Sequence, residues 1–177
     1  NGRFDRTNPE RDSGAIIVGA GGSGRPGCSS ARAILNFSSF GSRVDVHGWG
    51  ECVWSTGYGD GHQSDANPLD RNTFYTDGFS GTSSASPFVA AAVANIQGIA
   101  MKNFGAPLKP AQLRQLLTDT GLPQLGDVSK KIGPLVNLRS AIDTLIENPP
   151  TKKPSEKPTN QPTAKPSAVS KAGKASE

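Results

Sequence analysis

The sequence of 177 residues predicts an α/β fold, and three features carry this prediction. A continuous apolar run bounded by glycines at 14–22 is typical of a strand buried on both faces. Apolar and polar residues alternate at 43–50, which predicts a short, half-exposed strand. Helical periodicity follows after Gly81 and again in two later segments. Because these strands are too few for a closed sheet, about half of a domain is expected.

Three helices are predicted by their spacing and end signals. The first follows Gly81 and has a wide apolar face, formed by Phe88, Val89, Ala92, Val93, Ile96, Ile99 and Ala100. The second lies at 108–121, with Pro110 near its start and Gly121 past its end. The third begins near Asn137.

The C-terminal segment differs in composition from the rest of the chain. From Pro149 onward it is rich in proline and lysine, lacks aromatic residues, and cannot bury enough apolar surface to offset its ordering entropy. Residues 1–147 are therefore expected to fold, and residues 148–177 to form a disordered linker or tail. An alternative is that this tail docks on an acidic wall or a membrane surface.

Charge and hydropathy exclude two classes of partner. Lysines exceed glutamates by four after residue 148, which accounts for the whole net charge of +4. The remaining chain has no basic surplus that would indicate a nucleic-acid site. No apolar run is long enough to predict a membrane span.

Residues 79–104 contain the stretch Gly-Thr-Ser-Ser-Ala-Ser-Pro at 81–87 and continue as an Ala-rich, helical run. One hydroxyl suffices to cap a helix, so this density of small residues indicates that another group approaches closely. A serine at a helix start lies beside N–H donors that can stabilise an oxyanion on an attacked carbonyl. The residues alone leave a second interpretation open, a structural N-cap buried by small-residue packing.

The same stretch resembles the nucleophile segment of the subtilisin-like serine peptidases, whose pattern is Gly-Thr-Ser-x-Ala-Ser-Pro before a buried helix. The resemblance implies that Ser83 is the catalytic nucleophile and that Ser80, Ser84 and Ser86 support it. Position 85 is alanine, so the pattern is not the Gly-x-Ser-x-Gly elbow of α/β-hydrolases.

The resemblance extends over residues 1 to about 147 and corresponds to the C-terminal half of a peptidase domain. It includes the segments "DSGAIIVGAGG", "FSSFGSRVDVHGWGECVWSTGYGD", "LKPAQLRQLLTDTG" and "PLVNLRSAI". It implies a three-layer α/β sandwich with a mostly parallel sheet, and a serine endopeptidase acting on protein or peptide substrates. The triad Asp and His would precede residue 1, so the upstream half of the domain is an expected partner. The alternative is a non-catalytic surface or binding protein that retains the scaffold.

Asn1-Gly2 matches the end of a family motif whose asparagine side chain completes the oxyanion hole. The resemblance therefore implies an oxyanion role for Asn1. A simple Asn-Gly turn remains the other interpretation, because such dipeptides are common in turns.

The two histidines of the chain are not expected to be catalytic. His62 follows Asp60 by two residues and suggests an acid–base pair, but the resemblance places it in a surface loop. His47 alternates with Val44 and Val46, so we expect it on the exposed side of a strand with a structural role.

Residues 55–78 are polar and rich in Gly and Asp, which predicts a loop. Its carboxylates, at Asp60, Asp65, Asp70 and Asp77, raise the question of calcium, which needs six or more oxygen ligands. No ligand spacing is recognisable, so no metal site is assigned. Calcium stays under consideration only as a structural ion.

Cys28 and Cys52 are the only cysteines and lie 24 positions apart. In an exported peptidase such a pair is more often bridged than reactive. The resemblance implies a secreted or cell-surface protein, for which a disulfide is expected. Two free thiols are the alternative.

Overall fold

The structure is a computed structural model that describes Asn8 and residues 11–150. The elements in chain order are β1 (Val18–Gly21), β2 (Val46–Trp49), β3 (Val53–Thr56), the 3-10 helix η2 (Arg71–Thr73), β4 (Tyr75–Phe79), α1 (Thr82–Phe104), α2 (Pro110–Thr120) and α3 (Leu138–Glu147). The predicted tail at 148–177 lies almost wholly outside the described residues, so the division of the chain at residue 147 stays a prediction.

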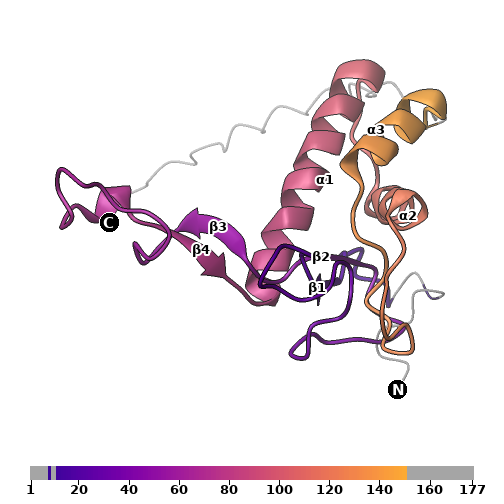
Figure 1. Cartoon of the computed structure of the whole chain (residues 1–177). Helices are drawn as coiled ribbons and strands as arrows, with labels where there is room; N and C mark the ends of the chain where they lie inside the picture. The colour runs from indigo at the N-terminus through magenta and orange to yellow at the C-terminus, as the bar shows by residue number, and fades with distance from the viewer. Residues whose placement is uncertain (1–7, 9–10, 151–177) are drawn as a thin grey trace, which may run out of the picture.

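β1 and β2 pair in parallel, with Val18 opposite Val46. Helix α1 packs on one face of both strands (Figure 1). An irregular segment covers the other face, where a Cβ added to Gly19 would lie 2.8 Å from the Cβ of Ile132. The strand predicted within 14–22 is therefore confirmed, and its glycines let a second layer of chain approach the backbone.

The strand at 43–50 forms as predicted, but it is not half-exposed. His47 is 0% exposed and Asp45 is 2% exposed. The Asp45 carboxylate accepts a hydrogen bond from the Ile17 N–H at 2.8 Å. The segment around Gly133 covers the side that alternation assigns to water, as is usual for parallel strands. The exposed position expected for His47 was therefore wrong.

The loop predicted at 55–78 is irregular over most of its length, but its two ends belong to β3 and β4, so the prediction was wrong there. β3 and β4 pair antiparallel, with Thr56 opposite Tyr75. We call residues 53–79 the arm, because this hairpin and its long connection project away from the three helices (Figure 1). Thr76 is the only buried residue of the arm, so no apolar periodicity marks its strands. β-branched and aromatic residues nevertheless favour extended backbone there.

All three predicted helices are confirmed. α1 ends at Gly105, which adopts a left-handed φ of 73° and donates its N–H to the Met101 carbonyl. Pro110 is the first residue of α2, where its missing N–H costs no helical hydrogen bond. The side chain of Asn137 caps α3 by accepting from the Ser140 N–H.

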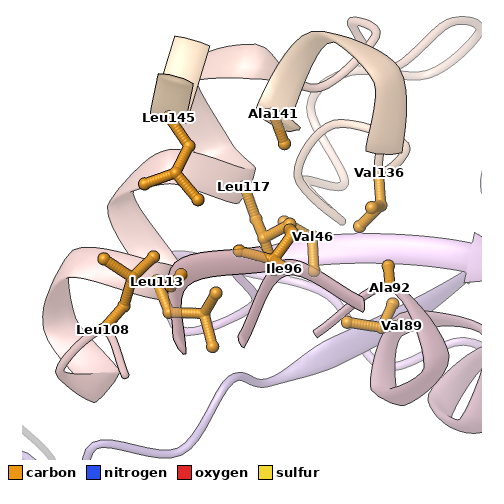
Figure 2. Close-up of a cluster of buried hydrophobic side chains, with 11 residues drawn as sticks. Val46, Val89, Ala92, Ile96, Leu108, Leu113, Leu117, Val136, Ala141 and Leu145 are labelled. Atoms are coloured by element: carbon orange, nitrogen blue, oxygen red, sulfur yellow. The ribbon is translucent and has the colours of Figure 1, made fainter. Parts of the chain in front are cut away.

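The main core lies where the three helices meet the parallel pair. Ile96 and Leu117 are both 0% exposed and lie with Val46 near the centre of the cluster (Figure 2). Its members are Val46, Val89, Ala92, Ile96, Ala100, Leu108, Leu113, Leu117, Val136, Ala141 and Leu145. Among the described helices, α1 alone has the length and composition that would suit a membrane crossing. Its buried face, however, is the centre of this core.

Candidate active site

Ser83 is the second residue of α1 and is exposed. The N–H groups of Ser84 and Ala85 donate to the Gly81 carbonyl. The N–H groups of the first two residues, Thr82 and Ser83, have no acceptor one helical turn earlier, so they and the partial positive charge of the helix start lie beside the Ser83 side chain. The next two residues, Ser84 and Ala85, are buried. The helix start therefore presents Ser83 to solvent, while the two residues that follow it are held in the protein.

Gly81 makes this turn sterically feasible. It is the N-cap of α1 and has a φ of 118°, which side-chain-bearing residues rarely adopt. A Cβ at this position would lie 2.9 Å from the Ser83 Oγ. The backbone conformation thus favours glycine, and any other residue would also crowd the side chain of the candidate nucleophile.

The carboxyl end of β2 anchors the turn. The Ser84 Oγ donates to the Trp49 carbonyl at 2.7 Å, and the Gly81 N–H donates to the Gly50 carbonyl at 2.8 Å. A Cβ on Gly48 would lie 2.5 Å from the Ala85 carbonyl oxygen, so the helix start sits directly on the strand. We call β1, β2 and the first turn of α1 the platform.

The platform contains supporting residues that sequence reasoning missed. Trp49 and Gly50 act through their backbone carbonyls, which any residue type could supply. Gly48 and Gly50, at alternate positions in the strand predicted at 43–50, are the signal that could have indicated this close contact between strand and helix start.

The neighbouring serines have different roles. Ser84 is buried and bonded to β2, whereas Ser86 is exposed and its hydroxyl donates to the Thr82 carbonyl within the same helix. Ser80 is exposed before the turn. Pro87 lies inside α1 and lacks the N–H that would pair with the Ser83 carbonyl.

Other parts of the expected machinery lie outside the described residues. Asn1, for which an oxyanion role is expected, is one of them. In the described part of the chain, neither histidine hydrogen-bonds to Ser83. The His47 ring is buried with its Nδ1 2.7 Å from the Gly133 carbonyl oxygen, and exposed His62 lies beside the Tyr75 ring.

Cys28 and Cys52 form a disulfide. The expected bridge is therefore confirmed. Cys52 lies two residues after Gly50, whose carbonyl holds the turn at Gly81. The guanidinium of Arg25 also donates to the Cys52 carbonyl at 2.6 Å. The bridge thus ties the segment after β1 to the chain that leaves the platform.

The acidic residues of the arm make local hydrogen bonds. The Asp60 carboxylate accepts from the Thr76 hydroxyl at 3.1 Å, and the Asp70 carboxylate caps η2 by accepting from the Asn72 N–H. Within the described ranges, no three Asp, Glu, His or Cys side chains gather as a metal site would require. These contacts show local structural roles for Asp60 and Asp70.

Comparison with known proteins identifies the family. A model of the Subtilase family matches residues 4–161, so the chain belongs to this family. The recognition made from the Gly-Thr-Ser-Ser-Ala-Ser-Pro stretch is confirmed at that level. A search of curated proteins found no match.

One solved structure supports the fold. The chain is similar to the patellamide maturation protease PatA, with 23% identity over 76% of this chain, 44% of that chain and a TM-score of 0.52. It also matches proteases from Pseudoalteromonas arctica, with 22% identity over 77% of this chain, 38% of that chain and a TM-score of 0.49. The chain thus spans less than half the length of either structure. The α/β fold of the subtilisin type is confirmed, as a part of that fold.

Proposed function

We propose that the protein containing this chain is a serine endopeptidase that cleaves protein or peptide substrates, with Ser83 as its nucleophile. The observation that carries the proposal is the exposed Ser83 at the start of α1, next to a turn held by buried contacts to β2. Membership of the Subtilase family supports the same chemistry.

The reaction is acyl transfer. The Ser83 Oγ attacks the substrate carbonyl carbon and passes its proton to a histidine, which we place together with its aspartate in the part of the protein before residue 1. The Ser83 backbone N–H and the Asn1 side-chain amide would receive the oxyanion. The histidine then protonates the leaving amine, and water hydrolyses the acyl-enzyme.

An apolar groove supports the proposal that an upstream half packs against this chain. The groove has a volume of about 480 Å³ and runs between the segment from Gly14 to β1 and the side of α1 that carries Val89 and Val93. A salt bridge between Asp12 and Arg114 holds the segment before β1 against α2. On the edge of β1 away from β2, Gly21 bridges Ile34 and the Ala20 carbonyl accepts from the Leu35 N–H at 3.1 Å. In the described residues no strand pairs with this edge at Val18, so a further strand can add there.

A serine-directed phosphonate tests the proposed nucleophile. Full-length protein should be labelled, and mass spectrometry should place the adduct on Ser83. The Ser83→Ala variant should fold but take up no reagent. A label that persists in this variant and maps to Ser84 or Ser86 would contradict the assignment.

The competing function is a non-catalytic binding protein that retains the scaffold. An intact triad Asp and His in the upstream sequence would favour the peptidase, and their absence would favour the binding protein. We further propose that the protein is secreted or displayed at the cell surface. The Cys28–Cys52 disulfide supports this, because disulfides persist in oxidising compartments.

A further inference from the structure

His47 is a buried ionisable side chain that the proposed reaction does not use. Its ring is fully buried on β2, and Nδ1 donates to the Gly133 carbonyl oxygen at 2.7 Å. Nε2 is therefore the unprotonated nitrogen, and it has no hydrogen-bond partner among the described residues. A Cβ on Gly21 would lie 2.8 Å from Nε2, so the backbone of β1 closes directly over the ring.

The same residue joins three segments through its backbone. Its N–H donates to the Pro134 carbonyl at 2.9 Å, and its carbonyl accepts from the Val136 N–H at 3.4 Å. β1 pairs along its other side. Two residues further along β2, the Trp49 carbonyl accepts from the Ser84 hydroxyl that anchors the nucleophile turn. A disturbance at His47 therefore reaches that turn along one short strand.

We propose that His47 is a positioning residue that holds the nucleophile turn only while its imidazole is neutral, so that acid loosens the platform. Protonation would place an N–H at Nε2 with no acceptor and a charge in a site closed to water, which is costly. The strand can relieve this cost only by separating from Gly21 or from the segment around Gly133. The link to Ser83 rests on the proposed function, whereas the proton-sensitive contact of His47 does not.

Among the described residues, the elements packed against the His47 ring supply no anion that would compensate its charged form. β1, the first two turns of α1 and residues 132–136 contain no titratable side chain. The carboxylate of Asp45, the residue before β2, accepts a hydrogen bond from the Ile17 N–H. Burial lowers the pKa of His47 below its ordinary value of 6.5, the hydrogen bond to Gly133 partly opposes this, and the positive charge of Arg32 lowers it further.

The direction of the pH effect follows from this lowered pKa. As pH falls, the unfolded chain takes up the proton on this histidine before the folded chain does. The contribution of His47 to stability is therefore complete above pH 6.5 and decreases below it. The decrease reaches at most about tenfold in the unfolding equilibrium constant per pH unit, and it ends at the pKa of the folded state.

Urea unfolding of the full-length protein at pH 7.5 and pH 5.0 tests the proposal. A Ser83→Ala background prevents self-digestion, and His47→Gln and His62→Gln are added to it separately. Gln does not titrate, and His62 is an exposed matched control. The loss of unfolding free energy between pH 7.5 and pH 5.0 is compared between the two variants. Any upstream histidine contributes equally to both, so the difference reports on His47.

We expect the background protein and His62→Gln to lose the same stability on acidification, and His47→Gln to lose less, by up to about tenfold in the unfolding constant per pH unit below 6.5. Equal losses in all three proteins would overturn the proposal. Hydrogen exchange of the background protein gives the answer if His47→Gln does not fold. The protection of backbone amides is corrected for the pH dependence of intrinsic exchange. Acid should reduce this protection more in residues 44–50 and 133–136 than in α3. A uniform reduction over all these segments would contradict the proposal.

The rate of phosphonate labelling between pH 5 and 7.5, measured with Ser83 intact, connects His47 to the nucleophile. The labelling rate at pH 7.5 divided by the rate at pH 5 should be smaller in His47→Gln than in His62→Gln. Equal ratios in the two variants would contradict the connection between His47 and the nucleophile. An absence of labelling at every pH would instead contradict the proposed function. The urea measurement would still decide whether His47 is proton-sensitive.

Discussion

The platform and the arm are adjacent in the chain but differ in how they are held. In the platform, β2 is buried on both faces, and Ser84 and Ala85 of α1 are fixed beneath the exposed Ser83. In the arm, Thr76 alone is buried, while Tyr58 and Leu69 are 77% and 87% exposed. The platform thus derives its geometry from packing, whereas the arm derives it from strand pairing and local hydrogen bonds. This contrast suits the platform to hold a reacting group in place.

The largest expected effect is the loss of activity when the platform lacks the proposed upstream half of the domain. Chain 1–177 alone should show no appreciable hydrolysis of casein, because removing the triad histidine of subtilisin costs about 10⁶ in turnover. The open edge of β1 should also make the isolated chain poorly soluble. Adding the upstream half in trans should restore solubility and phosphonate labelling. A monomeric, cooperatively folded chain 1–177 that cleaves casein unaided would contradict this prediction.

Core and arm should respond very differently to truncation. Ile96→Ala should lower the free energy of unfolding by about 2–5 kcal/mol, because Ile96 is fully buried among the helices. Leu69→Ala, in the arm, should change it by less than about 0.5 kcal/mol. Urea unfolding of full-length protein measures both. Comparable losses would show that the arm is packed against another part of the protein.

The disulfide lies where the chain passes from the platform to the arm, because Cys52 directly precedes the arm. Cys28→Ser with Cys52→Ser should cost about 3 kcal/mol, because the bridge no longer restricts a loop of 24 residues in the unfolded chain. The intact protein should be two daltons lighter before reduction than after it. Ready alkylation of both thiols without reductant would count against the bridge.

The glycines that cap the two ends of α1 allow backbone strain at the site to be compared with backbone strain elsewhere. Gly81→Ala should cost roughly 1–3 kcal/mol and slow phosphonate labelling, because its φ is 118° and its new Cβ would crowd the Ser83 Oγ. Gly105→Ala is the matched control at the other helix end, where φ is 73° and no atom lies within 4 Å. It should lower stability without changing the labelling rate. Equal labelling rates in both variants would show that Gly81 does not shape the site.

Sequence patterns predicted the helices because their end signals and their packing agree. Pro110, Gly121 and Asn137 all lie where the expected helix boundaries place them. The start of a helix just after Gly81 was likewise predicted, whereas the role of Ser83 as nucleophile stays a prediction. The positive φ of Gly81 was not predicted, because it appears only in three dimensions.

Other features could not be predicted from local patterns. The burial of His47 depends on Gly133, which is 86 positions away in sequence. The strands of the arm lack apolar alternation, because pairing rather than burial forms them. The contact of Ser84 with Trp49 uses a backbone carbonyl, which leaves no signature in the residue type. The role expected for Asn1 stays a prediction.

The most direct test of the central claim compares phosphonate labelling rates of full-length Ser83→Ala and Ser84→Ala. Both variants should fold, which near-ultraviolet circular dichroism can verify. Our account predicts that Ser84→Ala is labelled more slowly than the unsubstituted protein, because it loses the hydrogen bond to the Trp49 carbonyl, and that Ser83→Ala is not labelled at all. A folded Ser83→Ala variant that is labelled, together with an unlabelled Ser84→Ala variant, would contradict the account.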